Sequence, residues 1–204
     1  MANVNDAGRS SCEQSRRGHA HAWSLLLGCW LLLACLVPAA VMAQTAGDGN
    51  TAERRIKAAF LYKFASYIEW PEASFPTPDT PLTIAIDGDD RLADEVAQLV
   101  TGRTIAGRSL LVRKLKSDAS PAGAHVLFAK DVREGRPPLS HIPSQPILVV
   151  TDAQGALNRG SAINFMIVDE HVRFEVSLED AERRGLRLSA RLLAVAQNVR
   201  SGKP

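Results

Sequence analysis

The sequence predicts an α/β fold: a single-domain three-layer α/β/α sandwich whose Rossmann-like sheet is mainly parallel and closes with a late antiparallel hairpin. Short apolar runs separated by helical or turn-rich segments carry this prediction, at residues 82–86, 109–115, 124–129 and 147–151. Such alternation is typical of parallel strands that helices cover on both faces. Two later apolar runs, at 163–168 and 172–176, flank Asp169-Glu170-His171 and predict the hairpin.

Residues 1–43 predict a signal peptide that is cleaved near Ala43. Three arginines precede a long apolar run, and Val41-Met42-Ala43 supplies small residues at the −3 and −1 positions of a cleavage site. Two alternatives stay open, a transmembrane anchor over residues 22–41 and a lipoprotein modified at Cys35. The small-residue end favours cleavage, which makes the predicted location of the mature protein periplasmic.

Cysteine usage and charge limit what the mature chain can do. All three cysteines (Cys12, Cys29 and Cys35) lie within residues 1–43. The remaining chain therefore forms no disulfide and offers no thiolate nucleophile or thiolate metal ligand. The formal net charge of the whole chain is only +2. This balance argues against a nucleic-acid partner, which would require clustered basic charge.

The predicted domain occupies residues 53–200 and follows a flexible tail at 44–52. Its first element is a helix over residues 53–69, in which a helical period places Phe60 and Phe64 on one apolar face. Pro71 ends this helix and begins a proline-rich connector. Asp89 or Asp90 is expected to cap a second helix that runs to about Val100. Two closing helices are expected over 178–184 and 189–199, and residues 131–143 are expected to be irregular or a short helix.

Parallel sheets bind ligands beyond the carboxyl ends of their strands, and this rule predicts a ligand crevice at Asp87 and Asp152. Three carboxylates, Asp87, Asp89 and Asp90, stand where a phosphate-binding loop would require backbone donors and glycines. No histidine has metal-ligand spacing, and no nucleophile-elbow or P-loop motif is present. We therefore expect no catalytic residue, no metal and no cofactor.

The aromatic residues near the start of the domain divide into two sets. Phe60 and Phe64 fit the apolar face of the first helix, whereas Tyr62, Trp70 and Phe75 do not fit it cleanly. Aromatic side chains off the core stripe are candidates for partner binding, because they bury large rigid areas at low entropic cost. The alternative is that Trp70 and Phe75 cap the edge of the core. Arg173, on an accessible hairpin strand, is a weaker partner-binding candidate.

Two motifs resemble the YfiR-like family of exported bacterial regulators. They are K-A-A-F-L-Y-K-F-A-S-Y-I-E-W-P at 57–71 and I-N-F-M-I-V-D-E-H-V-R-F-E-V-S-L-E-D-A-E-R-R-G-L-R-L-S-A-R-L-L at 163–193. The resemblance covers about residues 53–200 and implies a periplasmic α/β sandwich related to Rossmann-like folds, without nucleotide chemistry. This sequence departs from the family pattern at Ser177, where the family often has Asn. It also departs in the mature chain's lack of cysteine, and this second difference argues against redox control of the protein.

The family resemblance implies a function. Its best-known members bind the periplasmic sensor part of an inner-membrane diguanylate cyclase and restrain it, which lowers cyclic-di-GMP and biofilm formation, and members can form homodimers. The expected partner is therefore an inner-membrane sensor enzyme, a diguanylate cyclase or a sensor kinase. The alternative is a periplasmic small-molecule-binding sensor that uses the crevice at Asp87 and Asp152. An enzymatic role is the least favoured of the three.

Overall fold

The computed structural model describes residues 38–116, 119–130, 142 and 145–202, with side chains from Gly49 onward. The chain divides into two compact units, Met1–Gly49 and Asn50–Pro204. Within the first unit the structure describes only the beginning of helix α2 (Pro38–Tyr67), which continues into the second. The side chains at the predicted leader cleavage site, and nearly all of the predicted irregular stretch at 131–143, lie outside the described part of the chain.

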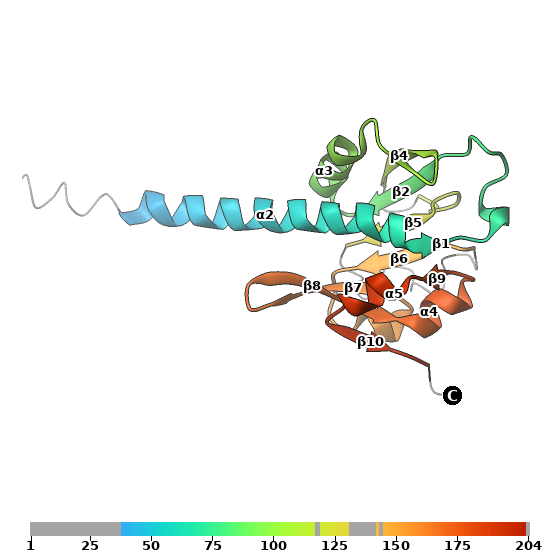
Figure 1. Ribbon diagram of the computed structural model, residues 1–204. Coiled ribbons are helices and arrows are strands. Elements are labelled where there is room, and N and C mark those ends of the chain that lie inside the picture. The colour runs from blue at the N-terminus through green and yellow to red at the C-terminus, as the bar shows by residue number, and fades with distance from the viewer. Residues whose placement is uncertain (1–37, 117–118, 131–141, 143–144, 203–204) are drawn as a thin grey trace, which may run out of the picture. The chain divides into compact units, whose positions relative to one another are not determined.

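An eight-stranded sheet organises the second unit, and it confirms the α/β prediction with its mainly parallel strands (Figure 1). Its spatial order is β10 (Asn198–Arg200), β8 (His171–Ser177), β7 (Ile163–Val168), β6 (Leu148–Thr151), β5 (Val126–Ala129), β2 (Leu82–Asp87), β4 (Arg108–Leu115) and β3 (Thr104–Ile105). The β7–β8 pair is the predicted antiparallel hairpin, and β3–β4 is a second antiparallel pair. Strands β5 and β6 are buried at every position, which explains why they read as continuous apolar runs.

The main core lies between the sheet and two helices, α2 and α3 (Asp90–Val100). Leu61 and Phe64 of α2 are almost fully buried, as are Leu92 and Val96 of α3. The rings of Phe60 and Phe64 contact those of two sheet residues, Phe165 and Phe174. The apolar face predicted for the first helix is therefore a core face. The Asp89 side chain caps α3 by accepting a hydrogen bond from the Leu92 N–H, so of the two candidate caps, Asp89 and Asp90, the structure selects Asp89.

The boundaries of the first helix differ from the prediction at both ends. Helix α2 includes residues 44–52, for which the composition predicted a tail, and no proline lies between Pro38 and Pro71 to interrupt it. At the other end, Ile68–Glu69 forms β1, which pairs antiparallel with β9 (Arg187–Leu188). Tertiary pairing with β9 thus replaces the last two residues of the predicted helix. A 3-10 turn at Glu72–Ser74 follows.

The C-terminal part also differs from the prediction. Helix α4 (Leu178–Arg183) matches its expected range, and the Ser177 side chain caps it. The helix predicted over 189–199 is wrong in extent, because α5 covers only Ala190–Ala194. The chain then turns into β10, which pairs in parallel with β8. The edge of β8 offers backbone hydrogen-bond partners to residues 198–200, and this tertiary pairing overrides their local helical propensity. In the described residues no helix is long and apolar enough to cross a membrane.

Candidate functional site

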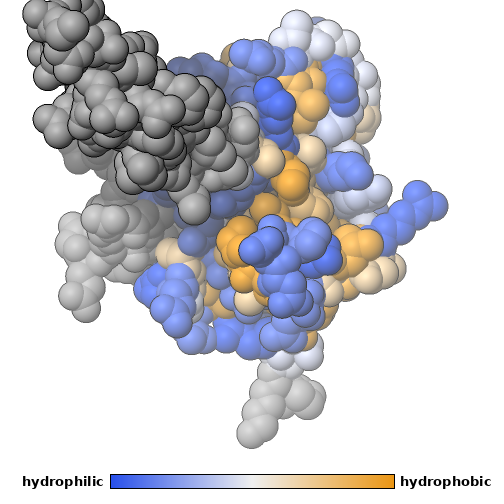
Figure 2. Space-filling model, turned by 90° about the vertical axis from the view of Figure 1, so that its left-hand side faces the viewer, coloured by the Kyte–Doolittle hydropathy of each residue, from blue (hydrophilic) through white to orange (hydrophobic). Residues whose placement is uncertain are grey.

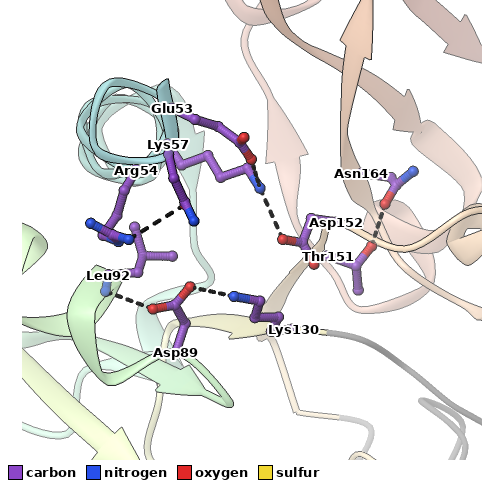
Figure 3. Close-up of polar contacts among 10 residues, drawn as sticks. Glu53, Arg54, Lys57, Asp89, Leu92, Lys130, Thr151, Asp152 and Asn164 are labelled. Carbon is purple, nitrogen blue, oxygen red and sulfur yellow. Dashed lines mark hydrogen bonds and ion pairs between the residues drawn. The ribbon is translucent and has the colours of Figure 1, made fainter. Parts of the chain in front are cut away.

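A cluster of charged side chains lies at the carboxyl ends of the central strands (Figure 3). Lys57 of α2 reaches across to Asp152, which follows β6, with 2.9 Å between Nζ and Oδ2. The same ammonium group lies 2.7 Å from Glu53 Oε1, one turn earlier on α2. The Lys57 side chain is 11% exposed and that of Asp152 is 13% exposed. A largely buried cation is thus held between two carboxylates.

A second ion pair completes the cluster. Lys130, directly after β5, places its Nζ 2.8 Å from Asp89 Oδ2. The other oxygen of Asp89 accepts the Leu92 N–H at 3.0 Å, so one carboxylate both caps α3 and binds a lysine (Figure 3). Burial by itself would raise the pKa of Asp89. The hydrogen bonds from Lys130 and Leu92 outweigh it and hold that pKa below its ordinary value.

The two ion pairs enclose a small cavity of about 80 Å³. Its lining is polar and carries both signs of charge: Asn50, Glu53, Arg54, Lys57, Asp89, Leu92, Lys130 and Asp152. Asp152 therefore lies at the predicted crevice. Asp87 does not line this cavity; the structure brings Asp89 there instead. Gly88, with a left-handed φ of 81°, turns the chain from the end of β2 toward α3, so the residue after this turn reaches the cavity.

Asp152 is anchored by a buried polar network at the end of β6. The neighbouring Thr151 hydroxyl donates to Asn164 Oδ1 at 2.8 Å and lies 2.9 Å from the Ser161 hydroxyl. Asn164 in turn donates to Glu175 Oε1 at 3.0 Å. These bonds satisfy polar groups that would otherwise be costly to bury. They also fix the backbone from which Asp152 meets Lys57.

The electrostatics of the cluster favour a structural role over proton transfer. Burial lowers the pKa of Lys57, but the hydrogen bonds and charges of Glu53 and Asp152 outweigh this and hold it above its ordinary value. The two carboxylates therefore favour the ammonium form of Lys57, which suits a group that holds Glu53 and Asp152 together. In the described residues, no three His, Cys, Asp or Glu side chains are grouped as a metal site would require.

The four predicted partner-binding residues occupy three separate places. Tyr62 is half-buried on α2, and the Arg103 guanidinium lies 5.2 Å from the centre of its ring. Arg173 is exposed on β8, opposite Met166 on β7. Trp70 and Phe75 lie together in the connector after α2, where both contact His125. The structure therefore does not join the four into one surface, and their role in binding stays a prediction.

The rings of Phe75 and Trp70 both contact the buried imidazole of His125. Phe75 stacks on the imidazole, with centroids 4.5 Å apart, and Trp70 meets it edge-on at 6.1 Å. Both residues are half-buried. Arg108 lies over the Phe75 ring at 4.0 Å and donates to the carbonyls of Thr77, Pro78 and Thr80. These contacts support the sequence alternative in which both aromatics close the edge of the core.

Other exposed apolar side chains were not singled out by the sequence. Ile56 on α2 is 44% exposed, Leu111 on β4 is 50% exposed and Ile167 on β7 is 54% exposed. On the side toward which the β7–β8 hairpin projects, hydrophobic residues lie between hydrophilic ones at the surface (Figure 2). Ile167 shares the core-facing side of its strand with Phe165, so strand periodicity alone would place it in the core.

Sequence reasoning also missed Glu53, Lys57 and Lys130. The Glu53–Lys57 pair has the i, i+4 spacing of a helical ion pair, and this signal was present in the sequence. Lys130 directly follows a predicted strand, which places it at the same edge as Asp152. The pairing of Lys57 with Asp152 joins positions far apart in the chain, so only the fold reveals it.

Comparison with known proteins points to a family. A family model described as YfiR/HmsC-like matches residues 54–197, which is most of the chain. No curated protein matches the chain significantly.

Proposed function

The chain belongs to the YfiR/HmsC-like family, and from this we propose that it is an exported periplasmic regulator that binds the periplasmic sensor part of an inner-membrane signalling enzyme. The enzyme is a diguanylate cyclase in this proposal, and binding holds it inactive. Repression lowers cyclic-di-GMP and, with it, biofilm formation. A dimer of the regulator and cleavage of the leader near Ala43 are parts of the same proposal.

The match of the family model over residues 54–197 carries the proposal. The charged side chains of the cluster pair with one another, Lys57 with Glu53 and Asp152 and Lys130 with Asp89. A regulator needs no reacting group. It needs only a higher affinity for the inactive state of its target, and each tenfold preference corresponds to about 1.4 kcal/mol.

Crosslinked co-purification tests the proposal. The tagged protein is crosslinked in cells and recovered from solubilised envelopes, and the bound proteins are identified by mass spectrometry. We expect an inner-membrane cyclase with a periplasmic sensor domain. A sensor kinase in its place would retain the regulatory function and change the target. Recovery of no membrane signalling enzyme, from cells in which the protein is abundant and folded, would contradict the proposal.

A second candidate function, small-molecule sensing, is favoured by the cavity between the Lys57–Asp152 and Lys130–Asp89 ion pairs. At about 80 Å³ it has room for a small polar ligand or a few waters. A thermal-shift screen over small polar metabolites checks this function, since a ligand that binds the native state raises the melting temperature. The effect must disappear in Asp152→Asn for the cavity to be the binding site.

A further inference from the structure

The outer edge of β4 is largely unpaired in the part of the chain that the structure describes. β4 pairs with β2 on its inner side along residues 110–115. On the outer side its partner is β3, which is two residues long and reaches only Arg108 and Ser109. Figure 1 shows β4 at the margin of the sheet, beside α3. A row of backbone donors and acceptors along residues 110–115 thus meets no further strand there.

The register identifies which backbone groups point outward. The carbonyls of Thr83 and Asp87 accept from N–H groups on the β5 side, so the odd-numbered residues of β2 face β5. Its even-numbered residues therefore face β4, since backbone groups alternate in direction along a strand. Ile84 is aligned with Val112. In a parallel pair, only one of two aligned residues directs its backbone groups toward the partner strand. Because Ile84 faces β4, Val112 faces away from β2, and so do Leu110 and Lys114, two residues to either side.

A groove lies beside this edge. Its volume is about 370 Å³, and its apolar lining comes from Ala97 and Val100 of α3 and from Leu110 and Val112 of β4. A strand added along β4 would place alternate side chains over this groove. The side chains between them would lie on the other face of the sheet, near the exposed Leu111. The groove and the exposed leucine thus provide an apolar contact on each face.

The charge of β4 selects among possible occupants. Residues 108–116 (RSLLVRKLK) contain two arginines and two lysines and no acidic residue. Pairing of this strand with a second copy of itself would place like charges opposite each other, which is destabilising. Lysine on an edge strand is a known protection against such self-pairing. An incoming strand rich in Asp or Glu would instead meet complementary charge.

We propose that the outer edge of β4, together with the groove between β4 and α3, binds an extended acidic segment of a partner protein, which joins the sheet as an additional strand. Backbone hydrogen bonds to Leu110, Val112 and Lys114 hold the segment, the groove takes its apolar side chains, and the basic residues of β4 select acidic ones. The inference rests on the proposed function in that the regulator has a protein partner, and it names the surface and chemistry of that contact.

A peptide experiment tests the surface without knowledge of the partner. The probes are two blocked peptides of the length of β4, one alternating valine with glutamate and one alternating valine with lysine. NMR of the labelled protein follows amide exchange along β4. We expect the glutamate peptide to protect the amides of Leu110, Val112 and Lys114, and the lysine peptide to bind more weakly by about tenfold or more. Absence of this alternate-residue protection, or equal binding of both peptides, would overturn the proposal.

Two variants at one position test the surface with the natural partner. Lys114→Pro removes an outward N–H from the edge and leaves the ladder to β2 intact. Lys114→Ala is its matched control, because it loses the same ion pair with Asp94 but keeps the N–H. In the crosslinked co-purification, Lys114→Pro is expected to lose the partner, whereas Lys114→Ala, which loses one of the four basic side chains but no backbone donor, should weaken its capture much less.

The outcomes separate this inference from the function on which it rests. If the wild-type protein and both variants capture the same membrane enzyme equally, the β4 inference is wrong and the regulatory function stands. If the wild-type protein captures no enzyme, the regulatory function fails, while the peptide experiment still decides whether β4 accepts an acidic strand. If Lys114→Pro does not fold, as judged by circular dichroism, the peptide protection pattern alone decides.

Discussion

The ring of Phe75 lies nearly parallel to the imidazole of His125, with 4.5 Å between centroids and 13° between planes. His125 is only 5% exposed, and both of its ring nitrogens are engaged. Nδ1 accepts the Thr83 N–H at 3.1 Å, and Nε2 donates to the Ser74 carbonyl at 3.1 Å. The imidazole therefore joins the connector after α2 to strand β2, and only the neutral form makes both bonds.

Acid is expected to loosen this junction. Burial lowers the pKa of His125 and the charge of Arg108 adds to it, while the bond to Ser74 only partly opposes the shift. The unfolded chain then binds a proton more readily than the native state, so this contribution to stability is present above the ordinary pKa of 6.5 and is lost as the pH falls through the native pKa.

Urea unfolding between pH 7.5 and 5 measures the effect. The wild type should lose stability more steeply than His125→Gln, which cannot titrate. His171→Gln, at the exposed hairpin tip, is the matched control and should follow the wild type. A native pKa for His125 at or above 6.5, read by NMR, would contradict the assignment.

Removal of Lys57 should destabilise the protein. Lys57→Met leaves Asp152 and Glu53 close together in a partly buried place without their shared cation. Removal of one partner of such an ion pair should lower the free energy of unfolding by about 1–3 kcal/mol, after allowance for the exposure of Glu53. Chemical denaturation gives the value. Arg55→Ala is the control, since Arg55 is exposed and its contact with Glu95 is 3.9 Å long. Equal stability of the two variants would show that the shared ion pairs of Lys57 contribute nothing.

Two non-glycine residues at the tip of the β7–β8 hairpin adopt a strained backbone conformation. Asp169 and Glu170 have φ values of 48° and 62°, in the left-handed region that a two-residue turn of this type requires. Glycine adopts this conformation without the Cβ penalty, which is about 1 kcal/mol. Glu170→Gly is therefore expected to raise the melting temperature. Glu179→Gly, in the helix α4, should lower it instead. A lower melting temperature for Glu170→Gly would show that the Glu170 side chain contributes to stability.

Two neighbouring aromatic residues of α2 are expected to separate folding from binding. Phe64 is almost fully buried in the aromatic core, so Phe64→Ala should cost about 3–5 kcal/mol of stability. Tyr62 is only half-buried, and Tyr62→Ala should leave the fold intact and weaken repression. Thermal unfolding and co-purification of the membrane enzyme measure the two effects. Unchanged capture by a folded Tyr62→Ala protein would remove Tyr62 from the binding surface.

The longer strands were predictable because each is a short apolar run closed by a turn. β7 was predicted at its observed bounds, and an aspartate cap of α3, at Asp89 or Asp90, was predictable because an Asp before an amphipathic segment is a local signal. β1, β9 and β10 were not predictable, since each is two or three residues long and depends on a partner strand distant in sequence.

The candidate site was predictable only in part. Asp152 directly follows a strand, and ligand sites of parallel sheets lie beyond the carboxyl ends of their strands. The choice of Asp89 over Asp87 depends on side-chain direction in a turn, and the partnership of Asp152 with Lys57 depends on how α2 crosses the sheet. The exposure of Ile167 likewise does not follow from strand periodicity, which groups it with the buried Phe165.

We propose that this protein restrains a membrane enzyme that makes cyclic-di-GMP. The most direct test measures cyclic-di-GMP in cells that lack the protein, in cells that produce it, and in cells that produce it without residues 1–43. We predict a higher level in its absence, restoration by the full chain, and no restoration by the chain that lacks the leader. An unchanged cyclic-di-GMP level in the absence of the protein would contradict the proposed regulatory function.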